Sequence, residues 1–367
     1  MKIVCIIDDL QVGGTEKGLL VLSRHLPRDV ELSVVALFGH GGLAEKFRAE
    51  GVEVKELNCS KLTAPLAFAR LTWFLRSNSP DAVVGMRIMS RICAVASGKV
   101  AGVPVICLRW GSSPGAEGDR WLRAERWAVR HANRFSAGCR AISRDLEKVY
   151  GIQRERVWVI PPPIAEETDV PERRGEEVEK ALGIPKPACV IGTVANLNWR
   201  KDYPTLIRAA STVEKEVPEV HFVIVGEGAD RPKLENMVTR LGLKDRVHFL
   251  GYRDDIPDLL GAMDMFALTS VTEGLSAAVR EAMQAGLSCV VTRVGGLKEI
   301  IDHGETGLLV SPGKPDEVAE ALLKLIRNPK LRRSLGTAAQ QKVGTEYGAD
   351  LLAQRFVRMC ECCQLAR

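Results

Sequence analysis

The sequence predicts an α/β protein of two domains, each built on a doubly wound parallel sheet. Short apolar runs such as KIVCII (residues 2–7) alternate with helix-favouring stretches along most of the chain, which is the order of elements in such sheets. Aromatic residues make up only 5% of the chain although 46% of its residues are hydrophobic, so the core must be aliphatic, as in sheets buried on both faces. A length of 367 residues favours two domains over one.

The first predicted strand, residues 2–7, runs into a glycine turn. Gly13 and Gly14 open a helix with apolar positions at Leu19 and Leu22. Glycines at such a turn let another molecule approach the backbone, and the helix start offers amide donors to an anion. The other strands predicted in this half are also apolar runs, at residues 31–37, 52–57, 81–86, 103–108 and 157–164.

Three consecutive prolines, Pro161–Pro163, end the last of these strands. Proline can neither continue a ladder nor enter a helix interior, so the chain must leave the first domain here. We therefore predict a first domain over residues 1–163. The acidic, proline-flanked segment at residues 166–187 is typical of a surface linker with a short helix.

Composition excludes several classes of protein. The formal charge of +5 is too small for a nucleic-acid-binding protein, but it suits an anionic substrate or membrane surface. The apolar run at the N-terminus is too short for a signal peptide, and no later run reaches the length of a membrane span, so we expect a cytoplasmic protein. Of the ten cysteines, five lie in apolar runs as free thiols, namely Cys5, Cys93, Cys107, Cys189 and Cys289. The cluster Cys360, Cys362 and Cys363 is interpreted as a tail feature without a metal.

Residues 120–148 are rich in arginine, and a helix would collect these side chains on one side. Two interpretations compete. The segment is either a basic face that holds the protein to anionic lipid, or a solvated helix face with tryptophans in the core. The interspersed acids Asp119 and Glu125 favour the second.

The second half opens on a buried strand at residues 189–197, which is followed by Arg200 and Lys201. Positive charges at the exit of a strand can stabilise negative charge that develops on a departing group. Further strands ending in turns are predicted around residues 221–228 and 247–253. Gly295 and Gly296 precede another helix as further candidates for phosphate donors.

The strongest functional pattern is a pair of glutamates around a predicted helix start. Residues 265–270 are a predicted strand, Ser276 is the expected N-cap, and Gly286 ends the helix. Glu273 thus precedes the helix and Glu281 lies within it, at most about 12 Å apart by the helical rise.

Free amides of residues 274–278 lie between these two carboxylates, and a helix start with unpaired donors binds phosphate. A carboxylate on either side of a phosphate seat suits a nucleotide-sugar, with one acid accepting from ribose hydroxyls and the other from hexose hydroxyls. The alternative is an ordinary strand–loop–helix unit with a surface glutamate and a capped start.

The stretch EGLSAAVREAMQAGLSCVVTRVGGLKEIIDHGETGLLV, residues 273–310, resembles the retaining glycosyltransferases of family four, whose signature is this pair of glutamates. The resemblance also covers the Gly-Gly-x-Glu loop at residues 13–16, Lys201, and the GEG and HFLGYR segments, so it spans nearly the whole chain. It implies the GT-B fold, with two Rossmann-like domains and an interdomain cleft. The acceptor would bind residues 1–163 and the nucleotide-sugar residues 164–345, with a C-terminal helix at 346–367 returning to the first domain.

The resemblance also implies roles for individual residues. Glu281 would bind the ribose and Glu273 the hexose hydroxyls, while Lys201, Arg200 and the amides of residues 274–276 would stabilise the leaving diphosphate. The turn at residues 250–253 would receive the nucleotide base, and the Gly13 loop, including Thr15 and Glu16, would face the donor phosphate or the acceptor. The donor-binding candidates are Gly13, Gly14, Asn196, Leu250, Gly251, Tyr252, Arg253, Gly274, Leu275, Ser276 and Glu281.

This chain departs from the family pattern at two positions. Asn196 stands where relatives usually have an arginine, which puts one phosphate contact in doubt and leaves Arg200 as its substitute. Arg109 stands where many relatives carry a histidine that touches the donor sugar. Two interpretations of Arg109 stay open: a guanidinium contact to phosphate, or loss of the contact.

We therefore interpret the chain as a retaining glycosyltransferase that moves a hexose-type sugar from a UDP-, GDP- or ADP-sugar to an acceptor hydroxyl. No Asp-x-Asp motif occurs, so neither a metal nor another cofactor is predicted. No side chain is an obvious covalent nucleophile, so the acceptor would attack on the face that the diphosphate leaves, with a diphosphate oxygen taking its proton. The acceptor stays open among lipid-linked sugars, polysaccharides and small metabolites.

Two alternatives remain from the sequence. A nucleotide-sugar epimerase of the same architecture would need histidines and carboxylates for proton transfer, but the six histidines do not cluster near these loops. A nucleotide-sugar-binding protein without catalysis would fit the two departures from the family pattern.

Overall fold

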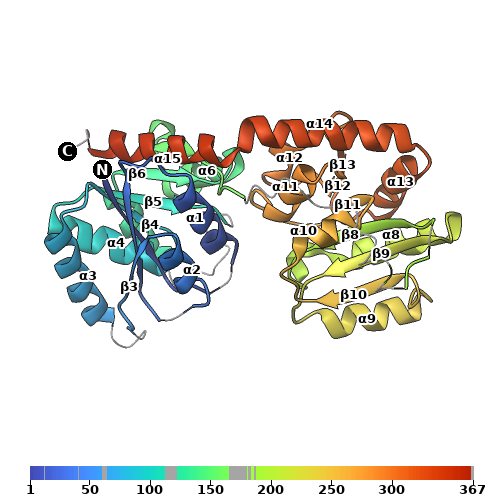
Figure 1. Cartoon of the computed structure of the whole chain (residues 1–367), viewed down its shortest axis with the longest axis horizontal. Coiled ribbons are helices and arrows are strands. Elements are labelled where there is room, and N and C mark those ends of the chain that lie inside the picture. Colours follow the sequence, from blue (N-terminus) through green and yellow to red (C-terminus); the bar gives the residue numbers. More distant parts are fainter. Residues whose placement is uncertain are drawn as a thin grey trace. The chain divides into compact units, whose positions relative to one another are not determined.

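The computed structural model describes residues 1–11, 13–39, 41–59, 64–111, 122–164, 180, 183–185 and 187–364. They fall into two compact units, one of Met1–Ala165 with Tyr347–Arg367 and one of Glu166–Glu346. Each unit contains one sheet of parallel strands accompanied by helices (Figure 1). The predicted class, α/β with two Rossmann-like sheets, is therefore confirmed. The predicted linker lies almost entirely outside the described residues.

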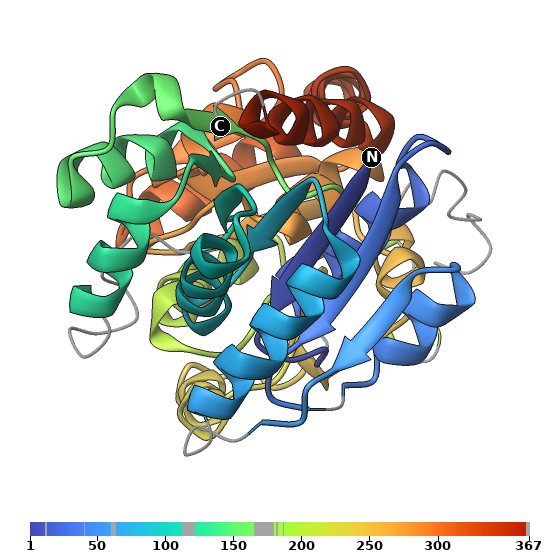
Figure 2. The same ribbon diagram turned by 90° about the vertical axis from the view of Figure 1, so that its left-hand side faces the viewer.

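The sheet of the first unit has seven strands in the order β3-β2-β1-β4-β5-β6-β7. Figure 2, which faces this unit, shows its strands side by side. The chain builds outward from β1 to β3 and then places β4 on the other side of β1, so the strand order reverses between β1 and β4. The strands are β1 (Lys2–Ile7), β2 (Glu31–Ala36), β3 (Glu53–Glu56), β4 (Ala82–Gly85), β5 (Val105–Arg109), β6 (Arg134–Ala137) and β7 (Val157–Val159).

Helices pack on both faces of this sheet. They are α1 (Gly14–Arg24), α2 (Ala44–Ala49), α3 (Ala64–Asn78), α4 (Ile88–Ala101), α5 (Leu122–His131), α6 (Arg140–Tyr150), the 3-10 turn η3 (Arg154–Arg156) and α15 (Ala349–Gln364). Alternate strand residues point to opposite sides. On β1, Ile3, Cys5 and Ile7 join a core with residues of α1, α2 and α15, while Val4 and Ile6 are buried on the side where α4 packs.

The C-terminal helix α15 supplies part of this core. Phe356, Cys360 and Cys363 are fully buried beside β1 and α1, at a spacing that places them on one helix face. The interpretation of the cysteine cluster as a tail feature is therefore wrong for Cys360 and Cys363. Free thiols suit these positions because they pack as small hydrophobes.

The strand β6 interrupts the segment in which the sequence analysis placed arginines on one helix. Helix α5 ends at His131 and α6 begins at Arg140, so Arg134 lies on a strand. Phe135, Ser136 and Ala137 are buried between β5 and β7. The run is too short and too polar at its start to show the apolar pattern of its neighbours, and tertiary pairing decides its conformation.

The second unit repeats this plan with six parallel strands in the order β10-β9-β8-β11-β12-β13. Its order reverses between β8 and β11. The strands are β8 (Cys189–Val194), β9 (Val220–Val225), β10 (Val247–Gly251), β11 (Met265–Leu268), β12 (Ser288–Thr292) and β13 (Leu308–Val310). The helical elements are η4 (Trp199–Lys201), α8 (Tyr203–Glu216), α9 (Arg231–Arg240), α10 (Ile256–Gly261), α11 (Ala277–Gln284), α12 (Leu297–Ile300), α13 (Pro315–Ile326) and α14 (Pro329–Tyr347).

Candidate functional site

The loops that leave β8 and β11 meet where the strand order of the second unit reverses. Ligands of open parallel sheets bind outside the carboxyl ends of the strands at such a point. Here the backbone N–H of Val271 donates to the carbonyl of Arg200 at 2.8 Å, and the Thr269 hydroxyl lies within 3.1 Å of the carbonyls of Lys201 and Asp202. These bonds fix the turn η4 against the loop that precedes α11.

An ion pair joins these two loops. Lys201 Nζ lies 2.5 Å from Glu273 Oε2, and the same oxygen accepts a hydrogen bond from the Ser270 hydroxyl at 3.1 Å. The two side chains are 17% and 15% exposed, so both are largely sheltered yet remain in contact with solvent. The structure thus brings together two residues that the sequence analysis had singled out separately, 72 positions apart.

Helix α11 begins and ends where the sequence predicts. Ser276 is its N-cap and accepts from the Val279 amide at 3.5 Å, and Gly286, just past the C-cap, has a φ of +75°. Within the described residues, the amides of positions 274–278 donate to no protein group, so the helix start can receive an anion. Glu281 lies in the second turn of this helix and is partly exposed.

The glycine pair after β12 was predicted to add phosphate donors, which the structure contradicts for Gly296 and leaves untested for Gly295. The Gly296 amide already donates to the carbonyl of Gly274 at 3.2 Å. Gly295 has a φ of +46°, and a Cβ there would lie 1.8 Å from the carbonyl oxygen of Glu273. The pair therefore packs under the Glu273 loop and shapes it, and the Gly296 amide is not available to a phosphate.

The predicted base-binding turn follows β10. Gly251 has a φ of +69°, and its carbonyl accepts from the Gly226 amide at 2.8 Å, which ties this turn to the loop after β9. Tyr252 is 63% exposed, and Arg253 is also exposed and pairs with Asp255.

Two further predicted positions lie near these loops in the sequence. Asn196, after β8, is exposed, and the neighbouring Leu197 amide donates to the Glu227 carbonyl at 2.8 Å. Leu250, the last residue before the Gly251 turn, is half-buried. Both positions are compatible with contact to a ligand, and their roles stay predictions.

The glycine loop of the first unit is exposed at Gly14, and Gly13 is the N-cap of α1. Thr15 is half-buried. Glu16 is only 1% exposed, and its Oε1 accepts from Arg87 Nη1 at 3.0 Å. The sequence analysis did not identify Arg87, because no motif near it in the sequence indicates a binding site.

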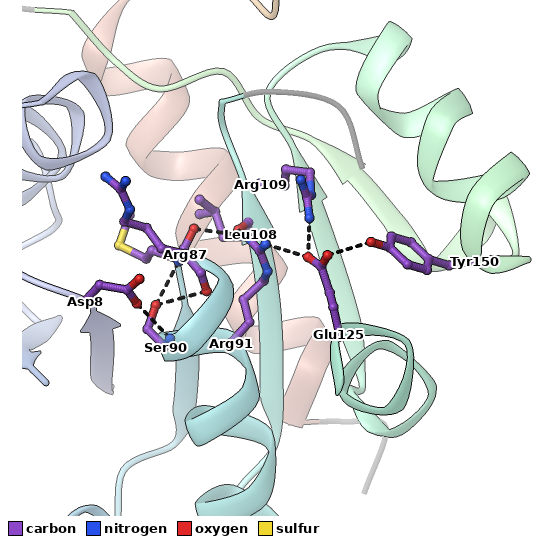
Figure 3. Close-up of polar contacts among 9 residues, drawn as sticks. Asp8, Arg87, Ser90, Arg91, Leu108, Arg109, Glu125 and Tyr150 are labelled. Atoms are coloured by element: carbon purple, nitrogen blue, oxygen red, sulfur yellow. Dashed lines mark hydrogen bonds and ion pairs between the residues drawn. The ribbon is translucent and has the colours of Figure 1, made fainter. Parts of the chain in front are cut away.

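Arg109 lies in a buried cluster around Glu125 (Figure 3). The Glu125 carboxylate accepts from Arg91 at 2.5 Å, from Arg109, and from the Tyr150 hydroxyl at 2.6 Å. Burial alone would raise the pKa of Glu125, but the Arg91 and Arg109 charges outweigh it and hold the pKa below its ordinary value. Arg109 is 5% exposed, so a contact with phosphate would require this cluster to open, and that contact stays a prediction.

Helix α5 presents a basic face. Arg123, Arg126 and Arg130 are exposed, and Trp127 is 40% exposed. Glu125, one of the acids that favoured a solvated mixed face, instead points inward, and the other, Asp119, lies outside the described residues with Arg120 and Trp121. The exposed face of the described helix therefore carries basic side chains and one tryptophan.

The described residues lack both a membrane-spanning helix and a cluster of metal ligands. No helix there combines the length and apolarity that a membrane span requires. Nor does that part of the chain gather three or more histidine, cysteine or acidic side chains in an arrangement suited to a metal ion.

Comparison with known proteins gives consistent matches along the chain. The family model described as Glycosyltransferase Family 4 matches residues 12–168, and the model described as Glycosyl transferases group 1 matches residues 175–342. The N-acetyl-alpha-D-glucosaminyl L-malate synthase of Bacillus anthracis is 28% identical over 214 residues, which are 58% of this chain and 53% of that protein. The match thus spans about half the length of this relative.

A longer match is the 2-deoxystreptamine N-acetyl-D-glucosaminyltransferase of Streptomyces fradiae, which is 27% identical over 92% of this chain and 88% of that protein. The crystal structure of Anabaena Alr3699/HepE in complex with UDP-glucose superposes with a TM-score of 0.87 at 22% identity, over 99% of this chain and 100% of that one. This likeness shows that the two share a fold.

Proposed function

Since the chain belongs to the glycosyltransferases of group 1 and family 4, we propose that it transfers a hexose-type sugar from a nucleoside-diphosphate sugar to an acceptor hydroxyl, with retention of the anomeric configuration. One observation carries the proposal: Lys201 and Glu273 pair at the strand-order reversal of the second unit, beside the start of α11. A cation, a carboxylate and free helix-start amides are what a sugar diphosphate needs for binding.

Each residue of this site has a proposed role. The amides of residues 274–276 and the Lys201 ammonium, with Arg200, hold the diphosphate and stabilise its charge as it leaves. Glu273 accepts hydrogen bonds from hexose hydroxyls. Glu281, in the second turn of α11, accepts hydrogen bonds from the ribose. The paired Lys201 also holds the Glu273 carboxylate in place while no sugar is bound.

The other predicted residues complete the proposed site. The turn of Leu250, Gly251, Tyr252 and Arg253 receives the base, and Asn196 lies on the phosphate side. The loop of Gly13 and Gly14 serves the acceptor or the donor phosphate from the first unit.

The proposed reaction needs no metal and no covalent sugar adduct. The acceptor oxygen attacks the anomeric carbon on the face from which the diphosphate departs, the bond from that carbon to the diphosphate breaks, and a diphosphate oxygen takes the acceptor proton. Lys201, Arg200 and the helix-start amides then stabilise the charge of the leaving diphosphate, which a divalent ion stabilises in metal-dependent enzymes.

A thermal-shift screen with UDP-, GDP- and ADP-glucose tests donor binding, because a ligand of the folded state raises the unfolding temperature by an amount set by its concentration over its Kd. We expect one nucleotide series to stabilise the protein, with or without EDTA. Proton NMR of the first product then reports the anomeric configuration. An inverted product or an isolable sugar adduct on Glu273 contradicts the mechanism, and an isomerised donor without acceptor indicates an epimerase.

We also propose peripheral contact with an anionic membrane through α5, which would suit a lipid-linked acceptor, at a cytoplasmic location. All ten cysteines are free thiols, which is typical of a reducing compartment. Arg123, Arg126 and Arg130 supply positive charge, and Trp127 has the amphipathic ring typical of membrane interfaces.

Co-sedimentation tests this contact with vesicles of phosphatidylcholine, with and without phosphatidylglycerol. We expect binding only to the anionic vesicles, weakened by salt and abolished in the triple variant R123E/R126E/R130E. The variant K233E/R240E/K244E, which reverses three exposed charges of the second unit, is the control and should still bind. Equal loss in both variants would contradict a role for α5.

A further inference from the structure

The strand-order reversal of the first unit carries its own group of polar side chains. Asp8 follows β1 directly, and its Oδ1 accepts from the Ser90 amide at 2.8 Å. Arg87 follows β4 as the N-cap of α4, and its amide donates to the Ser90 hydroxyl at 2.8 Å. Figure 3 shows Ser90 linked to both Asp8 and Arg87. Residues that start from two neighbouring strands are thus fastened together at one edge of the sheet.

Glu16 holds the side chain of Arg87 at this edge. Its carboxylate is 1% exposed, Oε1 accepts from Arg87 Nη1 at 3.0 Å, and Oε2 has no hydrogen-bond partner among the described residues. Burying a carboxylate oxygen without a hydrogen-bond partner lowers the stability of the folded protein. A residue of this kind is therefore a candidate for a functional role.

Gly13 makes room for that carboxylate. A Cβ on Gly13 would lie 2.3 Å from Glu16 Oε2, closer than any real contact. The glycine loop therefore has a local reason for its first glycine: a side chain there would displace Glu16 and release Arg87.

Arg87 itself remains accessible. Its side chain is 49% exposed although one nitrogen is fixed by Glu16. A guanidinium held in this way has lost part of its conformational freedom before any ligand arrives, which favours binding through its planar set of donors.

The charges around Arg87 select against anions. Asp8, Asp9 and Glu16 all interact electrostatically with its guanidinium, so three carboxylates surround this exposed cation, and the buried Arg91 is a second positive charge near Asp8. Burial raises the pKa of Asp8, while the Ser90 hydrogen bonds and the nearby Arg87 and Arg91 charges oppose that rise. A polyol fits this set because its hydroxyls accept from Arg87 and donate to Asp8.

We propose that Asp8 and Arg87 bind the acceptor of the transfer reaction, that Gly13 and Glu16 position Arg87 for it, and that this acceptor is a polyhydroxy ring without net negative charge. The inference rests on the proposed function, because it assigns the acceptor side of that reaction. Asp8 and Arg87 would touch the acceptor, whereas Glu16 acts through Arg87.

Transfer assays with a small acceptor panel test the class. The donor is whichever of UDP-, GDP- and ADP-glucose stabilises the protein most, and the acceptors are 2-deoxystreptamine, methyl N-acetylglucosaminide, L-malate and glucose 6-phosphate. We expect transfer to one or both of the first two acceptors. Transfer only to the anionic acceptors, or to none of the four, overturns the assignment.

Variants then test the residues. R87A should raise the acceptor KM about tenfold or more, by loss of a charge-assisted hydrogen bond, while the donor KM stays unchanged. R24A is the control, since Arg24 is 45% exposed and pairs with Glu50 in the same unit, and it should change neither KM. An unchanged acceptor KM in R87A overturns the assignment.

A double-mutant cycle separates positioning from a merely structural role. If Glu16 acts through Arg87, the variant E16Q/R87A should show no larger acceptor KM than R87A alone. Additive effects overturn the positioning role of Glu16. G13A should reproduce the acceptor KM of E16Q, and thermal unfolding of each variant identifies any that fail to fold.

A failure of the proposed function would be recognised separately. If no nucleotide-sugar stabilises the protein, calorimetric titration of 2-deoxystreptamine and methyl N-acetylglucosaminide into the wild type and R87A measures the acceptor site alone. Binding that R87A weakens supports the site, and absence of binding overturns it.

Discussion

The two units place an ion pair at the same point of the same topology, yet they bury it differently. In the first unit, the acid Glu16 comes after β1 and the base Arg87 after β4, and only the base is exposed. In the second unit, the base Lys201 comes after β8 and the acid Glu273 after β11, and both are partly exposed. The order is reversed, and the exposure differs: the first pair leaves only its cation accessible to solvent, while the second leaves both of its charges partly accessible.

The comparison extends to the groups behind each pair. In the first unit, Glu125 is buried with Arg91, Arg109 and Tyr150, and this cluster ties β5 to α4, α5 and α6. In the second unit, the Lys201–Glu273 pair rests on hydrogen bonds to backbone carbonyls. We therefore expect substitutions in the Glu125 cluster to cost stability and substitutions at Lys201 and Glu273 to cost activity.

The largest expected effect on stability is that of E125A. Removal of the carboxylate leaves Arg91 and Arg109 side by side in the interior, and breaking a buried pair in this way costs about 3 to 5 kcal/mol. Urea unfolding measures the loss. The control E50A removes the partner of the exposed Arg24 and should cost below about 1 kcal/mol. Similar losses of unfolding free energy in E125A and E50A would show that burial does not determine how much these ion pairs contribute to stability.

The next largest effect is on catalysis. K201A and E273Q should each lower kcat by about 10²- to 10³-fold, since preorganised groups of this kind contribute about 3 to 4 kcal/mol to transition-state stabilisation. The unfolding temperature should change little. K342A is a matched control, because Lys342 pairs with Asp302 at 2.6 Å and is 11% exposed. A comparable loss of activity in K342A would mean that any such pair in this unit supports activity.

The pH dependence of stability distinguishes His221, which lies on β9, from the site residues at the strand ends of the second unit. Burial, followed by the His248 and Arg246 charges, lowers the pKa of His221 to about 4 from 6.5. Between these values the unfolded chain binds a proton that the folded protein excludes, so stability falls as the pH drops through this window. The loss of stability is about 3 kcal/mol in total, at 1.36 kcal/mol per pKa unit.

Urea unfolding at pH 7 and pH 4.5 measures this loss, with H221Q for comparison. The glutamine side chain does not titrate, so the pH dependence should shrink in the variant. An equal dependence in both proteins would assign the effect to other groups.

The smallest expected effect comes from one of two glycines of left-handed conformation in the second unit. Gly295 and Gly313 have φ values of +46° and +68°. Alanine should cost about 1 kcal/mol of stability at Gly313 through the backbone alone, and more at Gly295, where its Cβ would lie 1.8 Å from the carbonyl oxygen of Glu273. Only G295A should also lower activity, because its Cβ would displace the Glu273 loop, whereas no atom lies within 4 Å of a Cβ at Gly313. Full activity in G295A would contradict the shaping role of Gly295.

Much of the second unit could be predicted because its signals are local. The strand at residues 265–270, the cap at Ser276 and the stop at Gly286 all lie within one short stretch, and each depends on nearby backbone geometry. Parallel-sheet topology then brings Lys201 and Glu273 to the same edge without any further information.

The first unit was harder to predict because its contacts are not local. Arg87 and Glu16 are 71 positions apart, and Glu125 meets Arg91 and Arg109 from a different helix. Neither pairing leaves a spacing pattern in the sequence. The same holds for Cys360, whose burial depends on where α15 packs.

The central claim is that Glu273 and Glu281 hold opposite ends of one nucleotide-sugar. Calorimetric titration tests it with UDP, GDP and ADP and their glucose conjugates, on the wild type, E273Q and E281Q. We predict that E273Q weakens binding of the glucose conjugate and leaves the nucleotide unchanged, while E281Q weakens both equally. Unchanged binding in both variants, or loss of nucleotide binding in E273Q, would contradict the account.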